Sequence, residues 1–323
     1  DGVVVKTTKK KVLSIEMTKR KTSTSKPEPK RSLLEKSDFE ASFSCSSSRG
    51  MVVNVGMELL RLRCVTRFHD AFMRVGGGKI GKSKLQDLFE AVMLASDLSN
   101  CPLIPQEGWI EKTLVHICQS ANISLCRDEI GMLERLARDV RESFVSSSSS
   151  SPQNNRDDKC VVVNHIRVEG KAARLAVLEQ MEPDLEAFDL RVDDVTVRVN
   201  RRHYEKLKNM FERNVAIEAD RTENEFHRSL FCLLVRYRAL RGGGVQGGGM
   251  QAAVPETVFN VLREHFSITF ECFASPLNCR YTRFCSAFID TDSAFGSVGS
   301  FWTFLPDRGS FQVNPPFDRK LID

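Results

Sequence analysis

Residues 267–278 read Ser-Ile-Thr-Phe-Glu-Cys-Phe-Ala-Ser-Pro-Leu-Asn. The first part is rich in β-branched and aromatic residues, which favour a buried strand, and the second part is a loop of mostly small residues. A nucleotide-binding α/β unit holds its cofactor on a loop in this position, directly after a strand. The stretch therefore predicts an α/β fold with a cofactor-binding loop. Its candidate cofactor-binding residues are Glu271, Phe273, Ala274, Ser275, Pro276 and Asn278.

A second apolar run follows at residues 284–292, Phe-Cys-Ser-Ala-Phe-Ile-Asp-Thr-Asp. It predicts a second strand that ends in acidic residues. An acid at the end of a second strand commonly binds the ribose of a cofactor. Asp290 and Asp292 are therefore also candidate cofactor-binding residues. For Glu271, a plain strand-end charge is the simpler alternative.

Near the end of the chain, a short β-propensity run at 311–313 leads into Asn314-Pro315-Pro316-Phe317. The Asn side-chain oxygen and the first Pro carbonyl can both accept hydrogen bonds from an exocyclic amino group. Two such acceptors orient the nitrogen and stabilise the charge that develops when a methyl group is transferred to it. The prolines fix the turn, and the aromatic ring offers a flipped base a stacking surface. These four residues are the candidate catalytic residues, with Asn314 also beside the cofactor, although a plain Pro-Pro turn is the alternative.

Together, residues 253–317 resemble the cap-specific adenosine-N6 methyltransferase family, whose proteins are also described as binding the phosphorylated tail of RNA polymerase II. The resemblance is carried by residues 270–279, 287–292, 295–297, 309–311 and 314–317. It implies a helical domain followed by a truncated Rossmann-like class I methyltransferase domain. It also implies S-adenosylmethionine as cofactor, 5'-capped mRNA as partner, and methylation at N6 of the cap-adjacent 2'-O-methyladenosine. The expected location is the nucleus, and no metal is expected, because the sulfonium already activates the methyl group.

A weaker resemblance extends to residues 202–208 and 230–237, and implies the helical domain that helps to grip the capped RNA in this family. Arg201 and Arg202, together with Phe317, are the candidate RNA-binding residues. Solvated basic residues at the start of a helix are the more ordinary reading of the two arginines.

The chain departs from the family in two respects. A WW domain needs two tryptophans some twenty residues apart, whereas this chain has only Trp109 and Trp302. We therefore expect this domain, and with it the contact to the phosphorylated polymerase tail, to be absent. The chain also begins at Asp1 and stops six residues after Phe317, so we expect a fragment that is truncated at both ends and is itself inactive.

The rest of the chain divides by composition. Residues 1–50 predict a disordered basic arm, since residues 1–36 hold 11 Lys or Arg against 4 Asp or Glu. Residues 51–241 predict a mostly helical domain, with a flexible Ser-rich insertion at 146–158 and a Gly-rich linker at 242–252. Residues 253–323 then form the N-terminal part of the methyltransferase domain. Within the helical domain, apolar spacing predicts helices around 59–72, 85–93, 130–144, 201–214 and 223–241, and strands at 161–163 and 196–199.

Composition excludes several classes of protein. The chain is 41% hydrophobic and 28% charged, which is ordinary for a soluble protein, and its net charge of +5 is compatible with a nucleic-acid partner. Its apolar runs fall short of membrane length, so we expect no membrane partner. Ten cysteines are present, but none are spaced as in zinc modules, so we expect no metal site.

One motif competes with the methyltransferase reading. Residues 76–83, Gly-Gly-Gly-Lys-Ile-Gly-Lys-Ser, match the P-loop pattern G-x4-G-K-[ST]. A P-loop follows a strand, but residues 67–74 have helical spacing, so an exposed loop between two helices is expected. The alternatives to a cap methyltransferase are thus a P-loop nucleotidase, a DNA or protein amino-methyltransferase, and an inactive RNA-binding or polymerase-binding adaptor.

Overall fold

A computed structural model describes residues 53–94, 102–106, 108–109, 113–120, 122–149, 159–167, 186–215, 222–244 and 254–315. All of them belong to the larger of two units, which spans Phe39–Asp323. The predicted basic arm at 1–50, most of the Gly-rich linker, and Pro316 and Phe317 lie outside the described residues.

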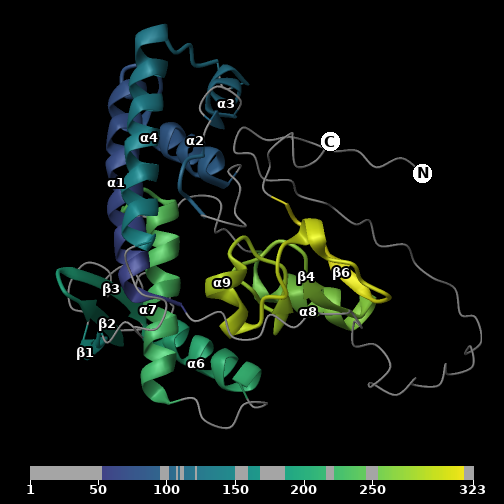
Figure 1. The fold of residues 1–323 in the computed structure, drawn as a ribbon. Coiled ribbons are helices and arrows are strands. Elements are labelled where there is room, and N and C mark those ends of the chain that lie inside the picture. Colours follow the sequence, from purple (N-terminus) through teal and green to yellow (C-terminus); the bar gives the residue numbers. More distant parts are fainter. Residues whose placement is uncertain are drawn as a thin grey trace, which may run out of the picture. The chain divides into compact units, whose positions relative to one another are not determined.

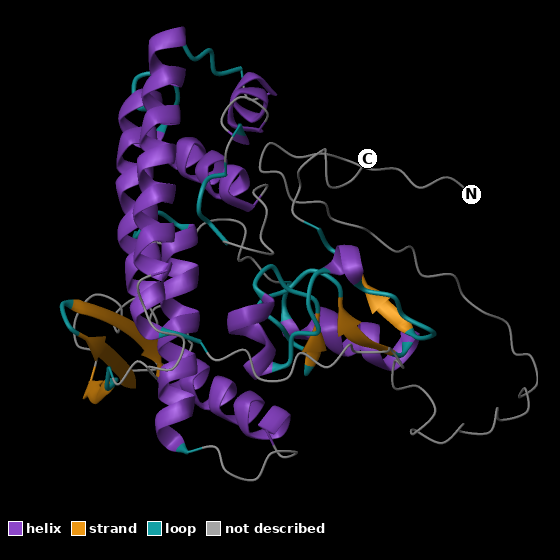
Figure 2. Ribbon diagram, in the orientation of Figure 1, coloured by secondary structure: helices purple, strands orange, loops and turns teal. Residues whose placement is uncertain are grey.

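Apart from a short helix at 115–120 that was not predicted, the first helices follow the predicted apolar spacing. They are α1 (Val55–Gly76), α2 (Lys82–Leu94), α3 (Val115–Ser120) and α4 (Arg127–Ser149). The side chain of Asn54 caps α1 by accepting a hydrogen bond from the Met57 amide at 2.9 Å. α1 packs against α4 along its length (Figures 1 and 2). The predicted helices around 59–72, 85–93 and 130–144 are confirmed.

The Ser-rich insertion begins later than predicted, because α4 continues through Ser149. The hydroxyl of Ser146 donates to the carbonyl of Glu142 at 2.7 Å, one turn back along the helix. Serine can satisfy its hydroxyl on the preceding turn in this way, so serines at a helix end need not break the helix. The prediction of flexibility at 146–149 is therefore wrong, and residues 150–158 lie outside the described residues.

A three-stranded antiparallel sheet follows, with the order β1-β2-β3. Its strands are β1 (Val162–Arg167), β2 (Glu186–Val192) and β3 (Val195–Asn200), as expected from the apolar residues at 161–163 and 196–199. Asp193 turns the β2–β3 hairpin with a positive φ of 51°, a conformation that Asp tolerates well.

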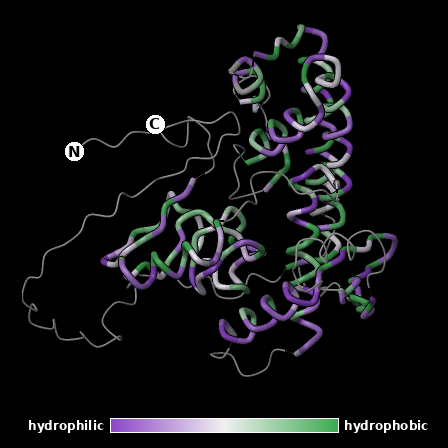
Figure 3. The backbone as a smooth tube through the Cα atoms, turned by 180° about the vertical axis from the view of Figure 1, so that it is seen from behind, coloured by the Kyte–Doolittle hydropathy of each residue, from purple (hydrophilic) through white to green (hydrophobic). Residues whose placement is uncertain are grey.

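Two helices come directly after this sheet, and both are confirmed. α6 (Arg201–Val215) is largely hydrophilic in Figure 3 and buries one stripe that includes Tyr204, Leu207 and Phe211. α7 (Glu223–Leu240) begins with a capping box between Thr222 and Glu225, and is buried over much of its length against α1.

A second, parallel sheet has the order β5-β4-β6. Its strands are β4 (Ile268–Glu271), β5 (Arg283–Phe284) and β6 (Ser310–Gln312), preceded by α8 (Glu256–Phe266). The strands predicted near 267–272 and 311–313 and the α/β class are confirmed.

The second predicted strand is only two residues long, so the expectation of a strand through 284–292 is wrong. After β5 the chain forms a helical turn, α9 (Ile289–Asp292), and then the 3-10 turns η4 (Ser293–Phe295) and η5 (Phe301–Thr303). The amide of Asp292 donates to the carbonyl of Phe288, as in a helix. Asp290 and Asp292 therefore belong to a helical turn and do not end a strand.

Side chains from both sides of the predicted linker share one hydrophobic core. The rings of Phe211 and Phe295 lie 6.0 Å apart, and those of Tyr237 and Phe288 lie 5.3 Å apart. Gly242 ends α7 with a φ of 67° and lies so close to His69 of α1 that a Cβ would fall 2.1 Å from its ring. The start of the linker is thus packed, and the domain boundary at 242–252 stays a prediction.

Candidate functional site

The carboxyl ends of β4 and β6 meet at one edge of the parallel sheet. Phe270 and Glu271 pair with Phe311 and Gln312, and the Cys272 amide donates to the Gln312 carbonyl at 2.8 Å. The loop after β4 therefore starts beside the strand that leads to Asn314, which is exposed, and to Pro315, which is half-buried. In α/β sheets ligands bind at this edge. The structure thus brings together the predicted cofactor loop and the first half of the Asn-Pro-Pro-Phe motif.

The loop after β4 contains a closed helical turn, which we call the Ser275–Asn278 turn. The side-chain oxygen of Asn278 accepts hydrogen bonds from the Ser275 amide at 2.7 Å and from its hydroxyl at 3.0 Å. The Asn278 and Cys279 amides donate in turn to the Ser275 carbonyl, at 3.1 and 2.9 Å. Ala274 joins the loop to the end of β5, since its amide donates to the Cys285 carbonyl at 3.0 Å. The backbone of this loop is thereby fixed without glycines.

Glu271 has a structural role in the same loop. Its side chain is 4% exposed, and one carboxylate oxygen accepts the amides of Arg280 at 2.6 Å and Tyr281 at 2.9 Å. Burial raises its pKa, and the two backbone hydrogen bonds oppose that rise. The carboxylate therefore closes the loop from 272 to 281 and points into the protein. The simpler expectation, a strand-end charge, describes its position better than direct contact with a cofactor.

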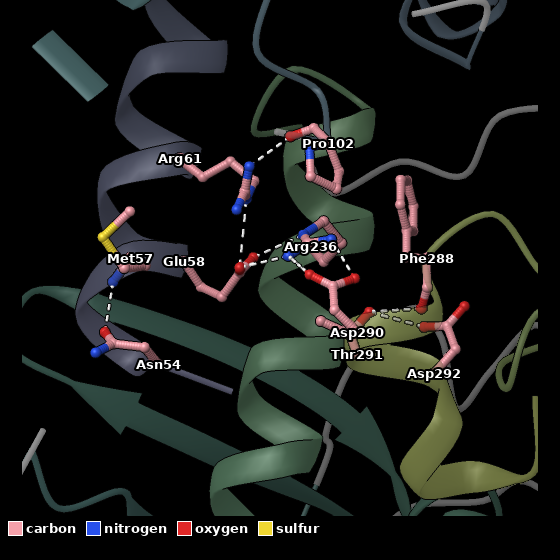
Figure 4. Close-up of polar contacts among 10 residues, drawn as sticks. All are labelled: Asn54, Met57, Glu58, Arg61, Pro102, Arg236, Phe288, Asp290, Thr291 and Asp292. Carbon is pink, nitrogen blue, oxygen red and sulfur yellow. Dashed lines mark hydrogen bonds and ion pairs between the residues drawn. The ribbon is translucent and has the colours of Figure 1, made fainter. Parts of the chain in front are cut away.

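The two candidate ribose ligands are bound by helix α7, and Figure 4 shows the contact of Asp290 with Arg236. Arg236 of α7 donates to both oxygens of Asp290, and the Tyr237 hydroxyl donates to Asp292 at 2.7 Å. Asp292 is fully buried, and burial raises its pKa to about 7 against the opposing hydrogen bonds of Tyr237, Ser286 and Thr291. The reason for choosing them, acids at the end of a strand, is thus wrong, and both carboxylates are engaged inside the protein.

Aromatic side chains that the sequence did not single out lie beside the loop. The ring of Phe273 is 4.6 Å from that of Phe301 and 6.3 Å from that of Trp302, which is 64% exposed. Two adjacent aromatic residues, Phe301-Trp302, are visible in the sequence, but no local sequence pattern indicates that they lie near Phe273. These rings border the part of the loop in which Phe273, Ala274 and Ser275 were predicted to bind the cofactor.

The candidate RNA-binding arginines are exposed at the start of α6, and both face acidic residues. Arg201 pairs with Glu186 and Glu205, each at 2.7 Å, and Arg202 lies 3.8 Å from Glu256. Exposed ion pairs of this kind are weak and exchange readily, so a phosphate can compete for either arginine. Their assignment to RNA stays a prediction.

Lys206, one turn further along α6, is a residue that the sequence analysis did not single out. Its Nζ atom donates to the Pro276 carbonyl at 2.9 Å and also to the Leu277 carbonyl at 3.4 Å. Pro276 was predicted to bind the cofactor, and its carbonyl instead accepts this hydrogen bond. Seventy residues separate the two partners, so no local pattern could have shown the contact.

The Walker-like loop lies between α1 and α2, as predicted. A helix takes the place of the strand that a P-loop requires, and Lys79 is bound to Glu129 at 2.6 Å. In the described parts of the chain, no group of three or more His, Cys, Asp or Glu side chains is arranged to hold a metal ion. Likewise, no described helix has the length and apolar character needed to cross a membrane.

Comparison with known proteins supports the resemblance to this family. Residues 206–323 match the family described as "Phosphorylated CTD interacting factor 1 WW domain". Two curated relatives are named mRNA (2'-O-methyladenosine-N(6)-)-methyltransferase: that of Homo sapiens is 35% identical over 185 residues, and that of Mus musculus is 39% identical over 157 residues. The alignments cover 57% and 46% of this chain, but 26% and 22% of the relatives, so the chain spans about a quarter of their length. The resemblance stated from residues 253–317 is confirmed.

The matched range corrects one expectation. We expected the WW domain to be absent, and that expectation is wrong, because the family that matches residues 206–323 is itself described as a WW domain. The spacing of two tryptophans was the wrong criterion, since the matched range holds Trp302 alone. Its described residues instead include α6 from residue 206 onward, α7, α8 and the parallel sheet.

Proposed function

We propose that this chain, with residues 206–323 matched to that family, is part of an enzyme that transfers a methyl group from S-adenosylmethionine to N6 of the cap-adjacent 2'-O-methyladenosine of mRNA. Both curated relatives carry the name of this activity. The observation that carries the proposal is the edge where β4 and β6 end, because it joins the cofactor loop to Asn314 through the Cys272–Gln312 hydrogen bond.

The residues at this edge fit S-adenosylmethionine. Phe273 and Ala274 are half-buried in the loop that begins at Cys272, next to the strand that leads to the exposed Asn314. The small side chains of Ala274 and Ser275 let the backbone come close to a ligand. Phe273, Ala274 and Ser275 would hold the cofactor, with Asn314 beside them. When bound, the cofactor supplies a methyl group that its sulfonium already activates. Asp290 and Asp292 are not part of the proposed pocket, because α7 engages both.

Asn314 and Pro315 would bind the amine of the target base. The Asn314 side-chain oxygen and the Pro315 carbonyl accept hydrogen bonds from the N6 amino group, which orients its lone pair and stabilises the positive charge that develops on nitrogen. Phe317, which lies outside the described residues, would stack on the flipped adenine. Arg201 and Arg202 at the start of α6 would contact the phosphates of the capped RNA end.

The test is methyl transfer by the full-length protein with Asn314→Ala. Turnover on capped RNA that begins with 2'-O-methyladenosine should fall by about 10²–10³, the usual cost of one preorganised polar contact in a catalytic site. Asn260→Ala is the matched control, because Asn260 lies on α8, where its side-chain oxygen accepts a hydrogen bond from Arg263 of the same helix. Uncapped RNA, and capped RNA that begins with guanosine, should be poor substrates.

Each alternative gives a different result in this assay. Methylation of DNA or of a protein glutamine in place of capped RNA would identify another amino-methyltransferase. Tight capped-RNA binding without methyl transfer would identify an adaptor. Turnover that Asn314→Ala left intact would contradict the assignment of the motif.

The description of the matched family also points to a partner. It names the phosphorylated CTD, and we propose that the full-length protein binds the phosphorylated C-terminal domain of RNA polymerase II in the nucleus. Fluorescence anisotropy with a phosphorylated C-terminal-domain peptide should show binding, and the same peptide without phosphate should bind at least about tenfold more weakly, a difference of about 1.4 kcal/mol. Equal affinity for both peptides, or a protein that imaging places only in the cytoplasm, would contradict this part.

A further inference from the structure

The Ser275–Asn278 turn is held from outside at its carbonyl end. As at the end of any helical turn, the last carbonyls, here those of Pro276 and Leu277, point away from the turn and need partners elsewhere. The ammonium of Lys206 on α6 donates to both. Cations are favoured at the carboxyl end of a helical turn, where carbonyl dipoles converge. Lys206 therefore caps this turn from a different part of the chain.

The environment of Lys206 makes these hydrogen bonds necessary, because its side chain is partly removed from water. Its side chain is half-buried, and burial lowers its pKa, while nearby Cys279 and Glu271 oppose that shift. When a lysine ammonium loses part of its hydration, hydrogen bonds to protein groups must replace the lost hydrogen bonds to water. The two carbonyls of the turn supply those bonds. A surface lysine such as Lys208, which is 42% exposed and 3.6 Å from Glu223, is under no such requirement.

The other end of the turn lies against α7. The Tyr237 hydroxyl donates its hydrogen to Asp292 at 2.7 Å, and the side chain of Ser275 lies beside the same hydroxyl. Tyr237 is buried, and its ring packs edge-on against Phe288 at 5.3 Å. The first residue of the turn thus packs beside Tyr237 of α7, and its last carbonyls accept hydrogen bonds from Lys206 of α6.

We propose that Lys206 and Tyr237 are positioning residues for the cofactor loop, holding the Ser275–Asn278 turn where its backbone meets S-adenosylmethionine. The inference rests on the proposed function, and it adds that the cofactor pocket is built partly by the helices α6 and α7. Neither residue needs to contact the cofactor. A binding loop loses its efficiency when its backbone departs by only about 0.5 Å from the productive position, so the contacts beneath it matter.

The first experiment measures the turn itself, without any cofactor. Lys206→Met keeps the aliphatic stem and removes the donor. In the full-length protein, hydrogen exchange of the Asn278 and Cys279 amides, which close the turn on Ser275, should become at least about tenfold faster, a change worth about 1.4 kcal/mol. Lys208→Met, on the same helix, should leave that exchange unchanged, and Lys206→Arg, which retains a cationic donor, should restore much of the protection.

The second experiment measures binding of S-adenosylmethionine and S-adenosylhomocysteine by calorimetry on the same proteins. Lys206→Met should weaken both about tenfold, again about 1.4 kcal/mol, and raise the KM for the cofactor more than the KM for capped RNA. If exchange in the turn is unchanged in Lys206→Met, the turn is not held by Lys206 and the inference is wrong. If exchange rises but cofactor affinity does not change, the role in positioning for the cofactor is wrong.

The proposed function can fail separately. If the unmodified protein binds neither compound while exchange still responds to Lys206→Met, then Lys206 holds the turn and the methyltransferase assignment is what fails.

Tyr237→Phe serves as a second variant should Lys206→Met not fold, because it removes one hydroxyl and keeps the packing. It should also weaken cofactor binding, whereas Tyr281→Phe, which loses a hydroxyl bound to the Phe259 carbonyl, should not. Equal cofactor affinity in Tyr237→Phe and Tyr281→Phe would overturn the role of Tyr237.

Discussion

The guanidinium of Arg236 donates two hydrogen bonds to the carboxylate of Asp290, at 2.9 and 2.7 Å, and so ties α7 to α9. The same guanidinium bonds Glu58 of α1, with Nε at 2.8 Å from its carboxylate (Figure 4). Arg61 completes the cluster by pairing with Glu58 and the Pro102 carbonyl. Arg236, Glu58 and Arg61 are buried and Asp290 is half-buried, so each buried charge has an oppositely charged partner.

The first prediction concerns this cluster. Arg236→Met should lower the free energy of unfolding by about 3–5 kcal/mol, because it removes a partner from the buried Glu58 and the partner of the half-buried Asp290. Urea denaturation of the two proteins measures the difference. Arg63→Met is the matched control, because the Arg63–Asp194 pair is exposed on both sides and should contribute at most about 1 kcal/mol. Equal decreases in the free energy of unfolding for Arg236→Met and Arg63→Met would contradict the importance of the buried cluster.

The second prediction concerns pH. Burial raises the pKa of Asp292 from 3.8 to about 7, so between these two pH values the unfolded chain has lost a proton that the folded chain retains. The free energy of unfolding then falls as pH rises through this window, and the Asp292 contribution becomes constant above it. Asp292→Asn cannot ionise, so its melting temperature relative to the unmodified protein should rise from pH 4 to pH 7 and then level off. A difference that stayed constant from pH 4 to pH 8 would show that Asp292 is not held protonated.

The third prediction concerns the turn after α9. Gly296 has a φ of 103°, and a Cβ there would lie 2.4 Å from the Thr282 carbonyl oxygen, which belongs to the backbone and cannot move aside easily. Gly296→Ala should therefore destabilise the protein by more than about 1 kcal/mol. Gly78→Ala is the control, since a Cβ at Gly78 meets nothing within 4 Å. Thermal denaturation should separate the two variants, and similar melting temperatures would count against the strained turn.

The fourth prediction concerns the Walker-like loop. Lys82 is exposed at the start of α2, and a Cβ added at Gly81 would meet nothing within 4 Å. Gly81→Ala and Lys82→Ala should each leave stability and methyl transfer nearly unchanged, because neither residue bears on the core or the sheet edge. Magnesium-dependent ATP binding that Lys82→Ala abolished would reverse this interpretation and favour a nucleotidase.

Local patterns predicted most of the helices and strands. The apolar spacing of α1, α4, α6 and α7 and the β-propensity of β4 and β6 are set by neighbouring residues, so they can be read without knowledge of the fold. The Asn-Pro-Pro-Phe motif is local in the same sense, since its chemistry needs only adjacent residues. The serine tract misled the prediction, because helix α4 satisfies Ser146 on its own preceding turn.

The sequence by itself therefore determined the α/β class, the two halves of the candidate site and the family resemblance, because periodicity and short motifs act over a few residues. Only the tertiary structure decided which polar groups meet. It pairs Asp290 with Arg236 and Asp292 with Tyr237. It also places the Glu271 carboxylate against the backbone amides at 280–281, and the Lys206 ammonium against the carbonyl end of the Ser275–Asn278 turn. A buried polar group takes the partner that packing places next to it. The partners of Asp290, Asp292 and Lys206 lie 54 to 70 residues away, and contacts at that separation leave no trace in local sequence.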